Sequence, residues 1–195
     1  MDSDEGVTTY RSRPAVFTGV VLLAVGLWLV VDSVVRDGGA TALLVVGVVL
    51  AVGAVVVALT LRAAVFAGPD RLRIRNPFRT IDIPWSEVRE VRAEYSLEVR
   101  TSGDRGFHVW AIPVSLRERK RAMRVNARSQ AEDPYGGGHP TVPQAAWADH
   151  AVADFRGMAE RFATTSTGEV TVAWYWPVPA AVAVGVAFVI VGSVL

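Results

Sequence analysis

The sequence contains no cysteine, which excludes disulfide bonds, thiolate metal sites, iron–sulfur clusters and thiol nucleophiles. Charge is also scarce: charged residues make up 20% of the 195 residues, where a soluble domain carries about 25%. The formal net charge is only +1, which argues against a nucleic-acid binder on charge alone. Hydrophobic residues reach 51%, and the mean hydropathy is +0.33. The composition therefore predicts a membrane protein with a modest water-exposed part.

Three stretches of the chain lack any charged residue, namely 14–31, 38–61 and 170–195. A hydrocarbon core of roughly 30 Å requires about 20 helical residues. In lipid each backbone group must be hydrogen-bonded within its own segment, so helix is expected even for these valine-rich runs. We therefore predict a cytoplasmic tail over 1–13, a transmembrane helical hairpin over 14–61 and a third transmembrane helix over 174–195.

The ends of these stretches carry further signals. Trp174, Tyr175 and Trp176 are typical of an interfacial aromatic belt, and the prolines after them predict a helix start or a kink. A cleaved signal peptide is the alternative for the first stretch, with a small-residue site at Ala40–Ala42. It is disfavoured because the apolar run is long and a second run follows at once.

Arginines are concentrated on one side of the predicted spans. They precede the first span and follow the second: Arg11, Arg13, Arg62, Arg71, Arg73, Arg75 and Arg79. The loop between the two spans contains a single base, Arg36. The positive-inside rule then places the amino terminus and residues 62–169 in the cytoplasm and the carboxyl terminus outside. The expected location is the inner cell membrane, with several passes.

Small residues recur within the predicted spans. Gly47 and Ala51, and likewise Ala181 and Gly185, have the spacing that lets helices approach closely. Chance also produces such pairs in segments this rich in alanine and glycine, so lipid-facing positions are the alternative. No charge lies in the middle of a span to mark an ion or proton path, which argues against a channel or transporter.

The polar segment begins with β structure, over residues 66–112. Leu72 and Ile74 alternate with arginines, and Ile81 and Ile83 alternate around an aspartate, which predicts a hairpin. Residues 91–99 show the cleanest alternation in the chain and predict one strand, followed by a returning strand over 107–112. Such strands favour an antiparallel sheet with one buried face.

Two helices are predicted after the strands, separated by a glycine-rich loop within 132–140. The first, over 115–128, presents one basic face of Arg117, Arg121, Arg124 and Arg128. The second, over 143–163, has an apolar stripe of Trp147, Ala151, Phe155, Met158 and Phe162. The stripe fits docking on the chain's own sheet, and a membrane surface or a partner helix is the alternative.

Several sequence pieces together resemble a known family. They are Arg75-Asn76-Pro77-Phe78-Arg79, Ile83-Pro84-Trp85-Ser86-Glu87-Val88 and Val109-Trp110-Ala111-Ile112-Pro113, all following two amino-terminal spans. This pattern resembles bacterial membrane proteins with a PH-like (pleckstrin-homology-like) domain, common in actinobacteria, over roughly residues 14–124. The resemblance implies an α+β membrane protein with a small antiparallel, partly open barrel closed by a helix. The PH-like domain is expected over 66–131, and the loop and amphipathic helix over 132–169.

The candidate contact residues are arginines and tryptophans. Arg71, Arg73, Arg75 and Arg79 follow closely after the second span, where guanidinium groups suit lipid phosphates. Pairing with Asp82, Glu94 or Glu98 is the alternative. The basic face of 115–128 could likewise lie on anionic lipid or in solvent. Trp85 and Trp110 are expected to pack with their indole N–H bonded, and contact with a partner is the alternative.

No constellation indicates an enzyme, a cofactor or a metal. His108, His139 and His150 lack metal-ligand spacing. The glycines at 136–138 lack the Lys-Ser/Thr of a phosphate-binding loop. We therefore expect a non-enzymatic binding or scaffolding module at the cytoplasmic membrane face. Its expected partner is a protein, including a second copy, and anionic phospholipid headgroups are the alternative. Neither nucleic acid nor a small-molecule substrate is expected.

Overall fold

A computed structural model describes residues 7–93, 96–113, 124 and 147–195. Its helices are α1 (Arg13–Arg36), α2 (Gly39–Val56), the π-helix η1 (Val57–Arg62), the 3₁₀ turn η2 (Trp85–Glu87), α4 (Trp147–Phe162) and α5 (Pro177–Val194). Its strands are β1 (Thr8–Tyr10), β2 (Ala64–Ala67), β3 (Arg71–Arg75), β4 (Arg79–Pro84), β5 (Val88–Ala93), β6 (Leu97–Thr101), β7 (Gly106–Val109) and β8 (Thr171–Trp174).

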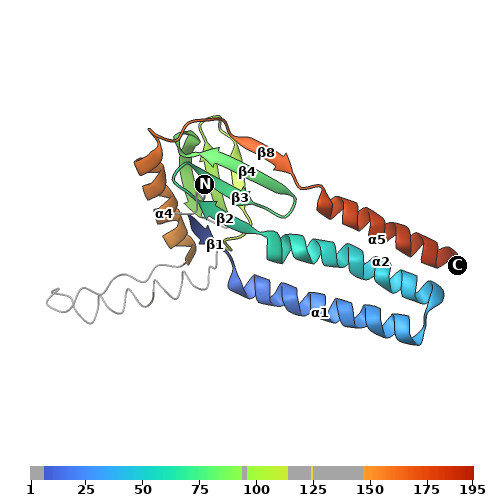
Figure 1. The fold of residues 1–195 in the computed structure, drawn as a ribbon. Coiled ribbons are helices and arrows are strands. Elements are labelled where there is room, and N and C mark those ends of the chain that lie inside the picture. Colours follow the sequence, from blue (N-terminus) through green and yellow to red (C-terminus); the bar gives the residue numbers. More distant parts are fainter. Residues whose placement is uncertain (1–6, 94–95, 114–123, 125–146) are drawn as a thin grey trace, which may run out of the picture.

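Three long helices project from one side of a β domain (Figure 1). They are α1, α2 continued by η1, and α5, and each is long and apolar enough to cross a membrane. Pro177 is the first residue of α5, so the proline marks the helix start rather than a kink. Most of each run predicted from missing charge is therefore helical, but Thr171–Trp174 at the start of the third run forms β8, so the third helix begins later than predicted.

Glycines bring α2 and α5 into backbone contact. A Cβ atom on Gly47 would lie 2.6 Å from the carbonyl oxygen of Gly185, and a Cβ on Gly185 would lie 2.6 Å from the carbonyl oxygen of Gly47. Real Cβ atoms do not approach a backbone oxygen so closely, so only glycine fits at these positions. Gly47 and Gly185 thus lie at a helix contact and do not face outward.

The β domain consists of two antiparallel sheets. Sheet A has the strand order β1-β2-β3-β4-β8, and sheet B has the order β5-β6-β7. Inward-facing residues of both sheets share one core, including Val65, Leu72, Ile74, Val91 and Val99. Strand alternation places these apolar residues inside and leaves the arginines of β3 outside.

The single strand predicted over 91–99 is wrong. The segment forms a hairpin in which Ala93 pairs with Leu97 and Val91 pairs with Val99. Three residues separate Ala93 from Leu97, so the residues that face the core are odd-numbered in both strands. The alternation therefore continues through the turn, and period alone cannot distinguish this hairpin from one strand.

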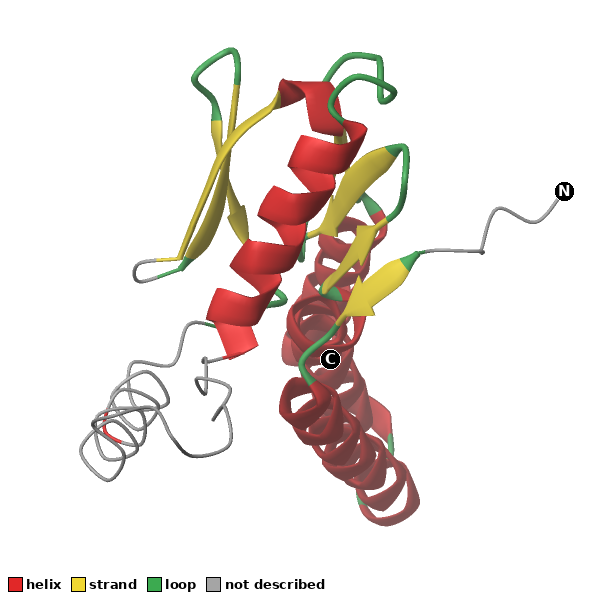
Figure 2. Cartoon of the chain, turned by 90° about the vertical axis from the view of Figure 1, so that its left-hand side faces the viewer, coloured by secondary structure: helices red, strands yellow, loops and turns green. Residues whose placement is uncertain are grey.

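Helix α4 lies across the opening between the two sheets (Figure 2). Ala151 and Phe155 are fully buried, and Met158 and Phe162 pack against the same core. The apolar stripe therefore docks on the chain's own sheets, and α4 covers the core that the two sheets share. The helix predicted over 115–128 lies outside the described residues, apart from Arg124, which is helical and exposed.

The segment before α1, expected as a tail, contributes β1 to the edge of sheet A. Tyr10 stacks edge-on against Phe155, with ring centroids 5.1 Å apart, and its hydroxyl donates to Asp154 Oδ2 at 2.7 Å. Burial and the neighbouring carboxylate raise the pKa of Tyr10, which keeps the phenol protonated as a donor. Strand β1 is thus fastened to α4 as well as to β2.

All three long helices connect directly to strands of sheet A. Two residues separate β1 from α1, one residue separates η1 from β2, and two residues separate β8 from α5. Such short connections hold the sheet close to the helix ends. The ends of β2, β3 and β4 at Ala64, Arg75 and Thr80 lie nearest these helices. We call this end of sheet A, where strands end rather than where an outer strand lies, the helix-proximal edge.

Candidate functional site

Three arginines at the helix-proximal edge stack on aromatic rings. The guanidinium carbon lies 3.9 Å from the ring centroid of Tyr175 for Arg62, 4.7 Å from that of Phe66 for Arg75, and 5.4 Å from that of Trp174 for Arg79. A cation held over a ring gains about 0.5–1 kcal/mol at an exposed site. We call these six residues the arginine–aromatic belt.

Strand pairing places the members of the belt together. Arg79 is the direct partner of Trp174 in the β4–β8 ladder. The backbone N–H of Tyr175 donates to the carbonyl of Phe78 at 2.8 Å, which extends this ladder one residue past β8. Phe66 pairs with Arg73, so Arg75 is its diagonal neighbour and reaches its ring.

Arg62 fastens the end of η1 to the β3–β4 turn. Its guanidinium donates to the carbonyl of Asn76 and, at 2.8 Å, to the hydroxyl of Thr80. The side chain is half-buried between these groups and the ring of Tyr175. This contact fixes where the second long helix ends relative to sheet A.

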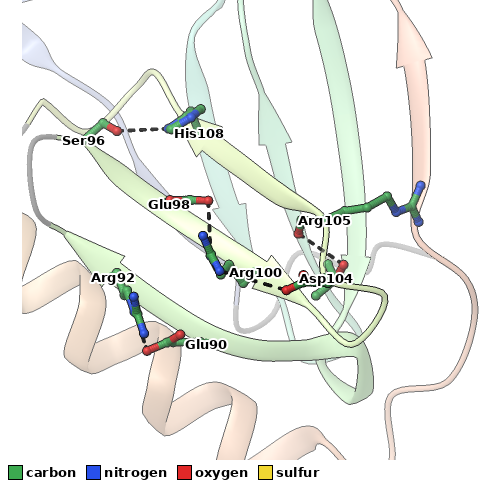
Figure 3. A network of polar contacts seen from close by, with 9 residues as sticks. Glu90, Arg92, Ser96, Glu98, Arg100, Asp104, Arg105 and His108 are labelled. Carbon is green, nitrogen blue, oxygen red and sulfur yellow. Dashed lines mark hydrogen bonds and ion pairs between the residues drawn. The ribbon is translucent and has the colours of Figure 1, made fainter.

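Three other arginines of the two sheets are paired with carboxylates. The Nε–O distance is 2.5 Å in the pair Arg73–Asp82. On sheet B it is 2.5 Å in Arg92–Glu90 and 3.5 Å in Arg100–Glu98 (Figure 3). The hydrogen bond from Arg92 lowers the pKa of Glu90 and so keeps this carboxylate ionised.

The belt arginines differ in this respect. Within the described residues, Arg62, Arg75 and Arg79 form no ion pair with a carboxylate. Their guanidinium faces lie on aromatic rings, and Arg75 and Arg79 are exposed. The belt therefore combines positive charge with aromatic surface and leaves guanidinium N–H groups for an external anion.

Asn76 connects the two sheets beside the belt. Its Nδ2 donates to the carbonyl of His108 at 2.7 Å, and its Oδ1 accepts from the backbone N–H of Trp110 at 3.0 Å. One side chain thus satisfies two backbone groups at the end of β7. This role was not predicted from the sequence, although the Asn-Pro step after β3 indicated an ordered turn.

Asn76→Ala is expected to lower the free energy of unfolding by about 1–2 kcal/mol, because two hydrogen bonds are removed. Asn76→Asp should be destabilised at least as much as alanine, since its second carboxylate oxygen would face the carbonyl oxygen of His108 at about hydrogen-bond distance without a proton between them. Pulse proteolysis of the detergent-solubilised full-length protein in urea measures both values. Wild-type stability of the alanine variant would show that the contact is unimportant.

The two motif tryptophans lie in different environments. Trp85 is fully buried, and its Nε1–H donates to the carbonyl of Gly68 at 2.8 Å. Trp110 is 58% exposed, so it does not pack in the core as Trp85 does, and contact with a partner stays open for it. The exposure of Trp110 arises because it follows the last residue of β7, at the end of the barrel nearest the helices.

The other predicted arginines do not all join the belt. Arg71 is exposed at the opposite end of β3, where it pairs with Pro84, and Arg73 is held by Asp82. Arg124 is exposed on a helix, and Arg117, Arg121 and Arg128 lie outside the described residues. The structure therefore brings together Arg75 and Arg79 and adds Arg62, which was not singled out as a contact residue from the sequence.

Comparison with known proteins finds a family match for the central part of the chain. Residues 62–133 match the family model of the bacterial PH domain. Among the described elements, the match takes in β2 to β7. No curated protein and no solved structure matches the chain. The PH-like domain indicates a binding module, because PH domains are typically non-catalytic.

The described residues contain no group of three or more histidines or acids placed to hold a metal ion. The chemistry that this part of the chain offers is the binding of an anion by guanidinium groups and the burial of apolar or aromatic surface. Both are properties of a recognition surface.

Proposed function

We propose that the chain is a membrane-anchored, non-enzymatic PH-like module whose arginine–aromatic belt binds anionic phospholipid headgroups at the cytoplasmic face of the inner membrane. Helices α1, α2 with η1, and α5 span the membrane in this proposal. The observation that carries it is a cationic belt, without ion pairs among the described residues, beside the ends of all three helices.

The position of the belt supports a lipid ligand. The connections of one or two residues hold the helix-proximal edge within reach of the headgroups. Phe78, Trp174 and Trp176 are exposed there, by 43%, 60% and 70%. Aromatic rings favour the membrane–water interface, and a basic residue beside an anionic leaflet gains about 1 kcal/mol.

The charges at the two ends of the helices support a cytoplasmic domain. Arg11, Arg13 and Arg62 lie at the ends nearest the PH-like domain. At the opposite end of α1, Arg36 is paired with Asp32, with an Nε–Oδ1 distance of 2.7 Å. The positive-inside rule then favours the domain and the amino terminus in the cytoplasm.

The arginines of β3 differ in their distance from a headgroup bound at the belt. Arg71 and Arg75 are four residues apart on one strand, so they are roughly 13 Å apart at about 3.3 Å per residue. This exceeds the screening length of about 8 Å at physiological ionic strength. A headgroup bound at Arg75 therefore gains little from Arg71, and Arg73 is already neutralised by Asp82.

Arg75→Gln/Arg79→Gln is expected to reduce the stabilisation of the protein by anionic lipid. The full-length protein would be placed in nanodiscs of phosphatidylcholine with increasing phosphatidylglycerol, and its thermal midpoint measured. Each arginine contributes about 1 kcal/mol beside an anionic headgroup, so the rise in the double variant should be smaller than in wild type by several degrees.

Arg71→Gln is the matched control, since it alters the same strand at its far end. Its midpoint should rise with phosphatidylglycerol as in wild type, and high salt should reduce the rise in both. An equal rise in wild type, the double variant and the control would contradict headgroup binding by the belt.

Protein recognition is the second candidate function, favoured by a cleft between β5 and α4. The cleft has a volume of about 440 Å³ and charged walls that include Arg89, Glu90, Arg156 and Glu160. Strand β5 is an edge of sheet B, and although Arg156 donates to its Val91 carbonyl at 2.7 Å, strand edges are a known docking mode for extended segments. Because the helices already supply attachment in this proposal, the cleft is available for a partner or a second copy.

A photo-crosslinking amino acid at position 89, in cells, is expected to give one discrete adduct if this cleft binds a protein. The same amino acid at position 105, in the β6–β7 turn, is the control. An adduct of twice the chain mass would identify self-association. Identical patterns from both positions would remove this candidate.

A further inference from the structure

A second surface near the helices is apolar. A cleft of about 390 Å³ lies between the start of α1, the π-helix η1 and the end of sheet B. Ala15, Leu59, Ala63, Val109, Trp110 and Ile112 contribute its apolar walls. A cleft of this size is in the range of ligand sites, which span about 300–1,000 Å³.

Close helix packing builds one wall of this cleft. Gly19 of α1 is buried against Thr60, and any side chain at position 19 would collide with the Thr60 hydroxyl. The Thr60 hydroxyl donates to the carbonyl of Val56 at 2.6 Å, inside the wider turn of the π-helix. Thr60 itself lines the cleft. The wall is thus part of the rigid junction of α1 with η1.

The cleft has a polar rim, and two arginines adjoin it in the sequence. Ser12, which caps α1, lines it together with Ser96. Arg11 and Arg13 flank Ser12 in the chain and are exposed, and neither forms an ion pair with any described residue. Apolar walls beside two cations complement a molecule with a hydrocarbon chain and an anionic head.

We propose that this cleft holds one acyl chain of an anionic phospholipid, whose phosphate lies at Arg11 and Arg13. The inference rests on the proposed membrane placement of α1 and η1. That placement puts Ala15 and Leu59, near the helix ends, at the boundary between headgroups and hydrocarbon. The cleft is a site separate from the belt, and Asn76 lies between them with contacts to Arg62 and to Trp110.

Photolabelling tests whether an acyl chain of the lipid occupies the cleft. The full-length protein would be reconstituted in phosphatidylcholine vesicles with a trace of phosphatidylglycerol that has a diazirine in one acyl chain. Wild type should be labelled within the peptide that contains Trp110 and Ile112. Ala15→Phe fills the cleft and should reduce this label to background, whereas Ala24→Phe, at an exposed position of the same helix, should retain it.

Charge selectivity tests the headgroup. Arg11→Gln/Arg13→Gln leaves the cleft walls intact and should reduce labelling by the phosphatidylglycerol probe by about thirtyfold, since each arginine contributes about 1 kcal/mol. Equal labelling of Ala15→Phe and Ala24→Phe would overturn the proposal. Equal labelling of the wild-type protein by phosphatidylglycerol and phosphatidylcholine probes that have the same acyl chain would also overturn it.

The belt and the cleft can fail independently. Arg75→Gln/Arg79→Gln should leave the cleft label unchanged, because neither residue lines the cleft. Disappearance of the label in that variant would show that the two surfaces are one site, which also contradicts the inference.

Discussion

Replacing Trp85 by alanine is expected to lower the free energy of unfolding by about 3–5 kcal/mol. Trp85 has no exposed surface and is the largest fully buried side chain of the described residues. The substitution opens a cavity and leaves the carbonyl of Gly68 without its indole donor. Pulse proteolysis of the full-length protein in urea measures the change.

Trp110→Ala is the matched control for this prediction, because Trp110 is 58% exposed and lies outside the buried core of the described residues. Its stability should stay within about 0.5 kcal/mol of wild type. If both variants were destabilised by the same free energy, the assignment of the two tryptophans to core and surface would be wrong.

Replacing Gly185 by alanine is expected to weaken the packing of α2 on α5 by about 1–3 kcal/mol. The added Cβ would meet the carbonyl oxygen of Gly47 at 2.6 Å, and a backbone atom moves only if the helices separate. Unfolding of the micelle-bound protein by sodium dodecyl sulfate, followed by circular dichroism, measures this destabilisation.

Gly53→Ala is the matched control, because it makes the same change at a glycine of α2 that is not in backbone contact with another helix. The nearest atom to its new Cβ is Leu23 Cδ2 at 3.5 Å, an ordinary contact. This variant should be neutral or slightly stabilised, because alanine favours helix over glycine by about 1 kcal/mol. A destabilisation equal to that of Gly185→Ala would mean that general helix effects, rather than backbone contact, decide the result.

Periodicity predicted the elements that have one buried face. The strands around Leu72 and Ile81 and the apolar stripe of α4 lie where the alternating and helical patterns placed them. The long helices follow from the absence of charge over whole segments. In each case the pattern extends over so many residues that it is not expected to arise by chance.

The two short edge strands of sheet A were not predicted from the sequence, and the reason is physical. Thr8–Tyr10 and Thr171–Trp174 are only three and four residues long, and β8 is exposed on both faces. Neither segment shows a pattern, because pairing with β2 and β4 fixes them instead. Only the tertiary fold shows that the chain enters and leaves sheet A beside its long helices.

Candidate contact residues were harder still to choose. The sequence contains many arginines, and their chemistry alone makes each a candidate for phosphate. Register decides which are neutralised, as in the pairing of Arg73 with Asp82, and which stack on rings, as in that of Arg79 with Trp174. The role of Asn76 likewise depends on how the β3–β4 turn meets β7.

The depth of the PH-like domain relative to the membrane is the most direct test of the proposed function. Because the chain has no cysteine, single nitroxide labels can be placed at Phe78→Cys, beside the belt, and at Gly103→Cys, in the open β6–β7 turn at the far end. Power saturation in vesicles, with oxygen and a water-soluble nickel chelate, gives the depth of each label. Headgroup binding by the belt predicts position 78 at headgroup level and position 103 in water. Equal exposure of both labels to water would contradict it.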